Sequence, residues 1–193
     1  MIYGDKMLKI KIEEIKGFTP VNTTKIENAG KKLEMIVNSE LFRVQFMAAD
    51  FSGETSKFKD WDRTDLYNYL MDGSEVLDPN EDNEANMTVT AYRSFKSVIG
   101  YTYGNIKGFY LNTRFMYREE KLIASTMLHE YGHKKGFDHD FRRTYRRQFS
   151  ICYQMNLIVE SCYDHINRTK ITPKVIIKKS RFQRFIYFIK NLF

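Results

Sequence analysis

Cysteine is scarce in this chain of 193 residues, which has two, Cys152 and Cys162. This count excludes a disulfide-rich scaffold, and we see no closed set of four cysteine and histidine ligands of the kind that a structural zinc module has. The two cysteines lie ten positions apart in a predicted turn and helix, a poor geometry for a bridge. We therefore expect free thiols and a reducing compartment.

Long apolar runs are also missing, so no segment is long enough to span a bilayer. The first ten residues interleave charged with apolar side chains and contain no seven-residue apolar core, so we predict no signal peptide. There is no internal repeat and no low-complexity linker. With 42% hydrophobic residues the chain can bury one good-sized core. We expect an intracellular protein, located in the cytoplasm or within a virion or other assembly.

Acidic residues are absent after Asp164, whereas eight of the 31 Lys and Arg residues follow it. The other 23 are balanced by 24 acids, so we divide the chain into a near-neutral domain, residues 1–168, and a basic amphipathic tail, residues 169–193. Apolar residues at helical spacing predict that residues 175–193 dock on a partner protein, lie on an anionic membrane surface, or pack on the chain itself. We expect no nucleic-acid binding, because no recognised binding fold or stacking module accompanies these charges.

Histidine is rare too, yet three of the four histidines lie between positions 129 and 139. If residues 119–135 are helical, His129 and His133 lie on one face with Cβ atoms about 6 Å apart and can hold one metal ion. Gly136 permits an abrupt left-handed helix end, which would turn His139 back toward that ion. Three protein nitrogens and a water make the open tetrahedral zinc site that catalysis requires.

The segment from His129 to His139 follows the pattern H-E-x-x-H-x-x-G-x-x-H, which resembles the zinc signature of the metzincin metallopeptidases. The resemblance implies that His129, His133 and His139 bind zinc. It also implies that Glu130 is the general base and that Gly136 forms a tight turn. It also implies a methionine in a turn beneath the metal, for which Met155 is the candidate. Tyr153 resembles the tyrosine that some metzincins use as an extra ligand or oxyanion stabiliser, although in those families it follows the methionine.

We expect an α+β fold of the zincin type. The resemblance implies a twisted, mostly parallel sheet with an antiparallel edge strand, a long helix, an active-site helix and a small C-terminal helical subdomain. Alternation predicts strands at residues 8–15 and from residue 87 to 92, and a helix is predicted from Pro20 to about residue 48. Residues 99–112 predict two strands about a Gly-Asn turn. The resemblance further implies that residues 110–112 lie at the edge and pair with extended substrate.

Other charged segments have competing interpretations. The acidic segment 72–86 predicts a solvated loop rather than a calcium site. Residues 51–54 resemble the zinc-blocking tetrapeptide of one metzincin family, but a surface turn is the simpler interpretation. Four arginines follow the third histidine and flank the expected cleft, where they either pair with carboxylates and solvent or favour acidic peptide side chains: Arg142, Arg143, Arg146 and Arg147.

A second ligand set is compatible with the sequence. Glu160 and Asp164 resemble the third-ligand helix of the gluzincins, in which Glu160 would bind zinc and Asp164 would orient a histidine. That ligand geometry does not require Gly136 or His139, so the sequence would contain both by coincidence. We therefore prefer the three-histidine set.

The resulting hypothesis is a zinc-dependent metalloendopeptidase, a hydrolase that cuts peptide or protein substrates by means of a zinc-bound water activated by Glu130. The alternative is a non-enzymatic zincin-fold structural or assembly component, for example of a virion, that docks through its basic tail.

Overall fold

The computed structural model describes residues 7–171, with side chains through residue 166. This part of the chain is α+β, with a four-stranded mixed sheet and five α-helices. The elements are β1 (Lys9–Lys16), α1 (Pro20–Val37), α2 (Glu40–Ala48), α3 (Arg63–Met71), β2 (Glu84–Tyr92), β3 (Gly100–Tyr101), β4 (Phe109–Asn112), α4 (Glu120–Lys134) and α5 (Ile151–Ile171). The predicted docking segment, residues 175–193, lies outside the described residues, and α5 continues past residue 168, where we placed the start of the tail.

The sheet has the strand order β1-β2-β4-β3, with β1, β2 and β4 parallel and β3 antiparallel at one edge. The expected hairpin forms, because Tyr101 of β3 faces Tyr110 of β4. The prediction that residues 110–112 form the edge is wrong. Since Tyr110 also pairs with Thr90 of β2, β4 lies inside the sheet and the two-residue β3 carries the free edge.

The predicted long helix is in fact two helices. α1 begins at Pro20 as expected, but it ends at Val37, and α2 starts at Glu40. The Asn38 side chain bonds the backbone N–H and C=O of Leu8, both at 2.8 Å, while the Ser39 hydroxyl accepts the first-turn N–H of α2. These side-chain bonds compete with continued helix and redirect the chain.

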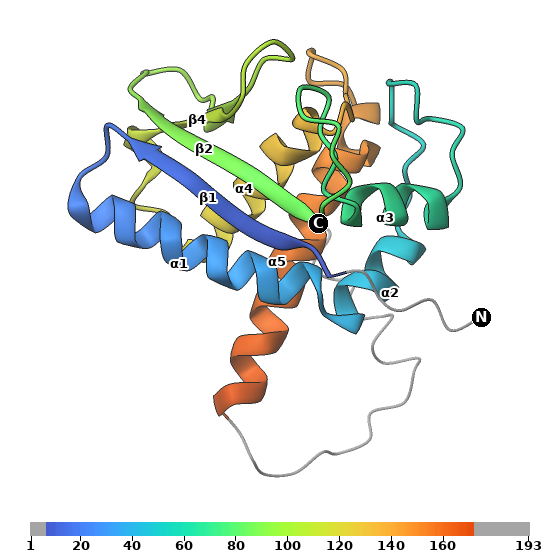
Figure 1. The fold of residues 1–193 in the computed structure, drawn as a ribbon, viewed down its shortest axis with the longest axis horizontal. Helices are drawn as coiled ribbons and strands as arrows, with labels where there is room; N and C mark the ends of the chain where they lie inside the picture. Colours follow the sequence, from blue (N-terminus) through green and yellow to red (C-terminus); the bar gives the residue numbers. More distant parts are fainter. Residues whose placement is uncertain (1–6, 172–193) are drawn as a thin grey trace.

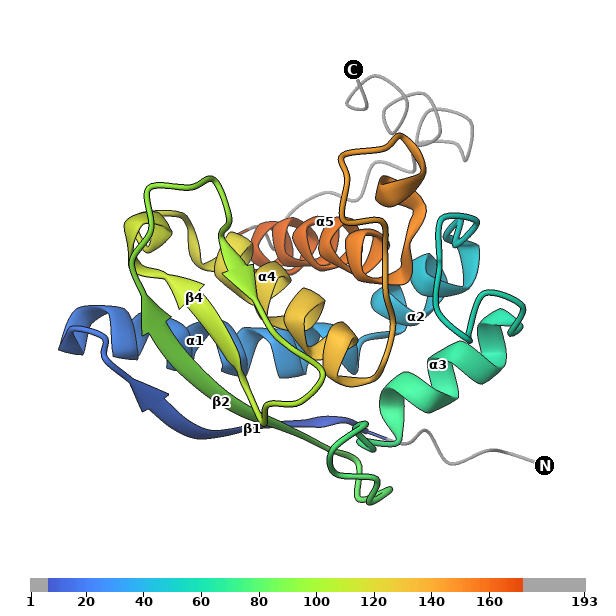
Figure 2. The ribbon, with the colours of Figure 1, turned by 90° about the horizontal axis from the view of Figure 1, so that it is seen from above.

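Helices α1, α4 and α5 lie on the same side of the sheet, with α4 packed between the other two (Figures 1 and 2). Gly30 allows the close approach of α1 to β1, because a Cβ there would lie 2.7 Å from Ile12 Cδ1. Eleven of the fifteen residues of α4 are buried, among them Met127 and Leu128. Burial of each such apolar side chain contributes roughly 1.5–3 kcal/mol to the stability of the fold. The predicted metal-binding helix is therefore held on most of its sides.

The acidic segment 72–86 is only in part the solvated loop that we predicted, because residues 79–82 are exposed but residues 72–75 are buried and β2 begins at Glu84. Asp72 and Glu75 are buried, and their carboxylates pair with Lys135 and Lys134 at the end of α4, each at 2.6 Å. Burial raises the pKa of Glu75 and lowers that of Lys135, while the partner charges act in the opposite direction. These two ion pairs fasten the loop to the C-terminal turn of α4.

No helix between residues 7 and 171 combines the length and the apolar character that a membrane span requires.

Candidate metal centre

Three histidine rings converge at the end of α4. His129 and His133 come from the helix and His139 from the loop that follows it. Nε2 of His139 lies 3.2 Å from Nε2 of His133 and 3.3 Å from Nε2 of His129. Two nitrogens bound at 2.0–2.1 Å to a tetrahedral ion are about 3.3 Å apart, so this spacing fits zinc. Among the described residues, these three form the one group of histidine, cysteine or acidic side chains with such geometry.

The local sequence produces this convergence. Positions 129 and 133 are one helical turn apart and so share a face. Gly136 adopts φ +89°, the left-handed conformation expected directly after the helix. Its N–H donates to the carbonyl of His133, and the N–H of Phe137 donates to that of Gly132, both at 3.0 Å. These are the two bonds of a Schellman end, which returns the chain toward His139.

Hydrogen bonds fix the tautomers of two of the rings. Nδ1 of His133 lies 2.9 Å from the carbonyl oxygen of Phe137, and Nδ1 of His139 lies 3.2 Å from that of Asp140. Because a carbonyl only accepts, both Nδ1 atoms carry the proton and both Nε2 atoms present lone pairs. Two lone pairs facing each other at 3.2 Å repel, and a cation bound between them would remove that repulsion.

Burial keeps the cluster neutral. It lowers the pKa of His129 well below its ordinary value, an effect reinforced by His133 and His139. Burial also lowers the pKa of His133, and it lowers that of His139 to about 4, with smaller contributions from His133 and Arg147. Near pH 7 all three imidazoles are therefore unprotonated, the form in which histidine binds metals.

Glu130 lies beside this cluster, between α4 and the edge strand β3. Its side chain is 4% exposed, and burial raises its pKa to about 8. A Cβ on Gly100 of β3 would lie 2.9 Å from Glu130 Oε1, so glycine leaves room for the carboxylate. A divalent cation bound to the histidines would favour the ionised form. A carboxylate so placed can exchange protons with groups in the adjoining cleft.

Tyr153 contacts the cluster, whereas the expected methionine turn does not exist. The Tyr153 ring centroid lies 4.8 Å from that of His129 and 5.0 Å from that of His139. Met155 lies in the first turns of α5, because the helix already begins at Ile151. It is fully buried, and its Cε would meet a Cβ on Gly132 at 2.7 Å. Met155 thus packs against α4 between the two helical histidines, from a helix rather than from a turn.

Glu54 was missed as part of this region, since residues 51–54 were predicted to form a surface turn. Its side chain is 1% exposed and accepts three backbone N–H groups, from Asp138 at 2.8 Å and from Ser56 and Ile151 at 3.1 Å. Glu54 therefore joins the loop of the third histidine to the start of α5. No local spacing signals this role, because Asp138 is 84 positions away.

The competing ligand set is not assembled. The Glu160 carboxylate accepts from the Ser125 hydroxyl at 3.1 Å, and Asp164 pairs with Lys121 at 3.1 Å. Neither acid belongs to the histidine group. Both serve to fasten α5 to α4.

A cleft of about 640 Å³ opens beside the cluster. It is bounded by Ile99 and Gly100 at the sheet edge and by His129 and Glu130 of α4, with Tyr153, Asn156, Arg143 and Arg147 among its other lining residues. Two of the four arginines predicted to flank the cleft thus line it. The edge strand β3, His129 and Glu130 share one opening.

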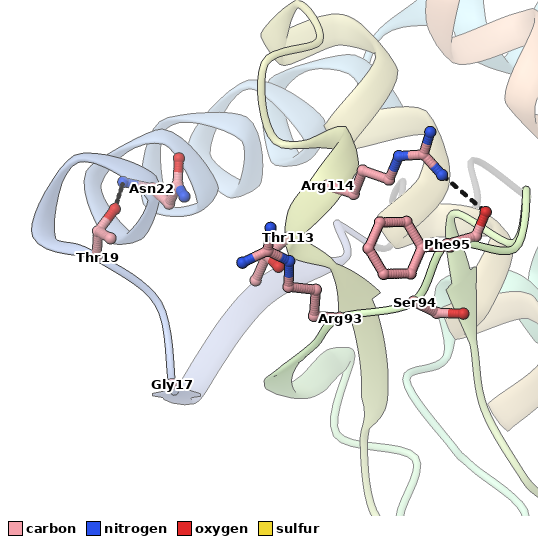
Figure 3. A pocket seen from close by; sticks show the side chains of 8 residues that line it. All are labelled: Gly17, Thr19, Asn22, Arg93, Ser94, Phe95, Thr113 and Arg114. Carbon is pink, nitrogen blue, oxygen red and sulfur yellow. Dashed lines mark hydrogen bonds between the residues drawn. The ribbon is translucent and has the colours of Figure 1, made fainter.

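A second hollow of about 470 Å³ lies where loops follow the carboxyl ends of β1, β2 and β4 (Figure 3). Its polar side chains bond locally: the Arg114 guanidinium donates to the carbonyl of Phe95 at 2.7 Å, and the Thr19 hydroxyl accepts the N–H of Asn22 at 3.4 Å. It shares no lining residue with the histidine cleft.

Comparison with protein-family models, with curated proteins and with solved structures finds no significant match to this chain. The cluster is therefore described by its own geometry: three neutral histidines within metal-binding distance of one another, at the edge of an α+β domain.

Proposed function

We propose that this protein is a zinc-dependent metalloendopeptidase of the metzincin type. The observation that carries the proposal is the convergence of three Nε2 atoms next to a cleft that is lined by His129, Glu130 and the edge strand β3. His129, His133 and His139 would hold zinc and leave one coordination position open. That arrangement is the one that catalysis requires, since a structural site is normally closed by a fourth protein ligand.

When bound, zinc would supply polarisation of the scissile carbonyl and a lower pKa for the attacking water. Glu130 would take the proton of that water and pass it to the leaving amine. An extended peptide would pair with β3 at Gly100 and Tyr101, whose outer side has no partner strand among the described residues. This pairing would bring the scissile bond along the edge toward Glu130.

Tyr153 would act as a hydrogen-bond donor. Burial raises the pKa of its phenol, an effect opposed by the charge of Arg147. The phenol therefore stays protonated near neutral pH and is suited to donate to a developing oxyanion rather than to serve as an anionic ligand.

The test combines metal analysis with cleavage of a mixed peptide library by the zinc-loaded protein. We expect one zinc per chain, lost in His139→Ala and retained in Glu160→Gln, the matched control for the competing ligand set. Glu130→Gln should keep zinc and lose cleavage by at least about 100-fold, the usual contribution of a general base. Full zinc loading of the wild type without any cleavage would refute the peptidase and favour the non-enzymatic assembly component.

A further inference from the structure

Arg147 occupies the wall of the cleft next to the histidines. It belongs to the short 3-10 helix Arg146–Phe149, and its guanidinium lies 4.8 Å from the centroid of the Tyr153 ring. The other contacts of that ring are with His129 and His139. The positive charge therefore lies one aromatic ring away from the metal-binding atoms.

This charge has no acidic partner within residues 7–166. Its Nη1 donates to the carbonyl of Phe141 at 3.2 Å, and its Nε is buried without any hydrogen-bond partner. Arg143, further along the same wall, donates to the Ser97 hydroxyl at 3.1 Å and likewise forms no ion pair with the described carboxylates. The guanidinium group of Arg147 lines the cleft, where no carboxylate of the described residues neutralises its charge.

Asn156 lines the cleft together with Arg147, and its buried Oδ1 has no partner. Because this oxygen only accepts, it offers nothing to an anion. Glu130 is the one carboxylate among the lining residues, and it lies on the α4 side. The opposite wall thus offers two guanidinium groups and no anion. Guanidinium groups bind carboxylates through paired, charge-assisted hydrogen bonds that a neutral amide cannot reproduce.

We propose that Arg147 binds the side-chain carboxylate of a substrate residue adjacent to the scissile bond, so that the protein selects peptides with aspartate or glutamate at that position. This specificity rests on the proposed peptidase function, because it concerns which peptide bond the protein cuts. Arg143 adds positive potential along the same wall. An amide in place of the carboxylate leaves the guanidinium without its anion, so affinity should differ by about 10- to 100-fold.

The test uses zinc-loaded Glu130→Gln protein, which should bind peptides without cutting them. Calorimetry would compare the affinities of two peptides that differ only in having glutamate or glutamine at one position. That position lies next to a bond that the wild type cuts. If the wild type cuts none, each position of the peptide is tested in turn. We expect the glutamate peptide to bind 10- to 100-fold more tightly, and the preference to disappear in Arg147→Gln. Arg142→Gln is the matched control, because Arg142 is exposed in the same segment and does not line the cleft.

Equal binding of the two peptides by the parent protein overturns the proposal, whether or not Arg147→Gln folds. Equal loss of both peptides in a folded, zinc-loaded Arg147→Gln also overturns it, since that result places Arg147 on a group that the two peptides share. The two proposals fail separately. An acidic preference in binding without any cleavage by the wild type refutes the peptidase alone, and cleavage without acidic preference refutes the role of Arg147 alone.

Discussion

Replacing Glu54 by alanine should weaken both the fold and the metal centre. The change removes a buried carboxylate that accepts three backbone N–H groups, two of which belong to Asp138 and Ile151. A hydrogen bond to a charged group contributes roughly 1.5–3 kcal/mol, and three on one carboxylate are not fully additive. We therefore expect the free energy of unfolding to fall by about 4 kcal/mol, a large share of the 5–15 kcal/mol typical of a domain.

Zinc affinity should fall in the same variant. Asp138 immediately precedes His139, and its N–H bond to Glu54 sets the path of that loop. Loss of a group that orients a metal ligand typically lowers metal affinity by about 10- to 100-fold. Competition with a chelator measures the zinc dissociation constant, and urea unfolding, with and without chelator, measures stability.

Two further variants sharpen this test. Glu54→Gln keeps one acceptor oxygen but turns an NH₂ group toward a backbone N–H, so its effect should lie between wild type and alanine. Glu27→Gln, on the exposed face of α1, should change stability by less than about 0.5 kcal/mol. A Glu54→Ala protein with stability within 1 kcal/mol of wild type, and with unchanged zinc affinity, would refute the reasoning.

Three other changes test separate parts of the structure. Gly100→Ala should push the Glu130 carboxylate out of place, since the new Cβ would lie 2.9 Å from its Oε1; we expect peptide cleavage to fall at least about tenfold with zinc content unchanged, and unaltered cleavage would contradict this placement. Asp72→Asn leaves the fully buried Lys135 ammonium without its anion and should lower the urea-derived stability by about 3–5 kcal/mol, whereas a change below 1 kcal/mol would show that the pair contributes little. Because the pKa of His139 is lowered to about 4 in the fold, against about 6.5 in the unfolded chain, its stabilising effect is complete above pH 6.5 and is lost as the pH falls toward 4. Burial also lowers the pKa values of His129 and His133, so they lose stability over the same range. Urea unfolding of chelator-treated protein should therefore show a loss of stability on acidification that is about 3 kcal/mol smaller in His139→Gln, and an equal loss in the two proteins would contradict this.

Local sequence was sufficient to predict the histidine cluster. The shared face of His129 and His133 depends on four-residue spacing, and the return of His139 depends on the left-handed conformation of Gly136. The strands predicted at residues 8–15 and 87–92 were found at residues 9–16 and 84–92, because alternation of apolar and polar side chains is a property of neighbouring positions. The end of α4 at Lys134 was predictable in the same way, because it depends on the nearby Gly136.

Contacts between distant positions could not be predicted in this way. The edge of the sheet was assigned to the wrong strand of the hairpin, because pairing with β2 decides which strand lies inside. The break at Asn38 depends on its bonds to Leu8, 30 positions earlier. Met155 was expected in a turn, but packing of α5 against Gly132 places it in a helix.

The letters from His129 to His139 by themselves determined that three imidazoles would meet, because helical periodicity and one left-handed glycine act over a few bonds. Folding across the whole domain determined what surrounds them. Glu54 and Lys135 are charged residues that composition alone would place at the surface, yet both are buried. The backbone N–H of Asp138, 84 positions away, donates to Glu54, and the carboxylate of Asp72, 63 positions away, pairs with Lys135. The physical reason is that burial of a charge depends on which distant groups arrive beside it, and that information is not contained in any short stretch of the chain.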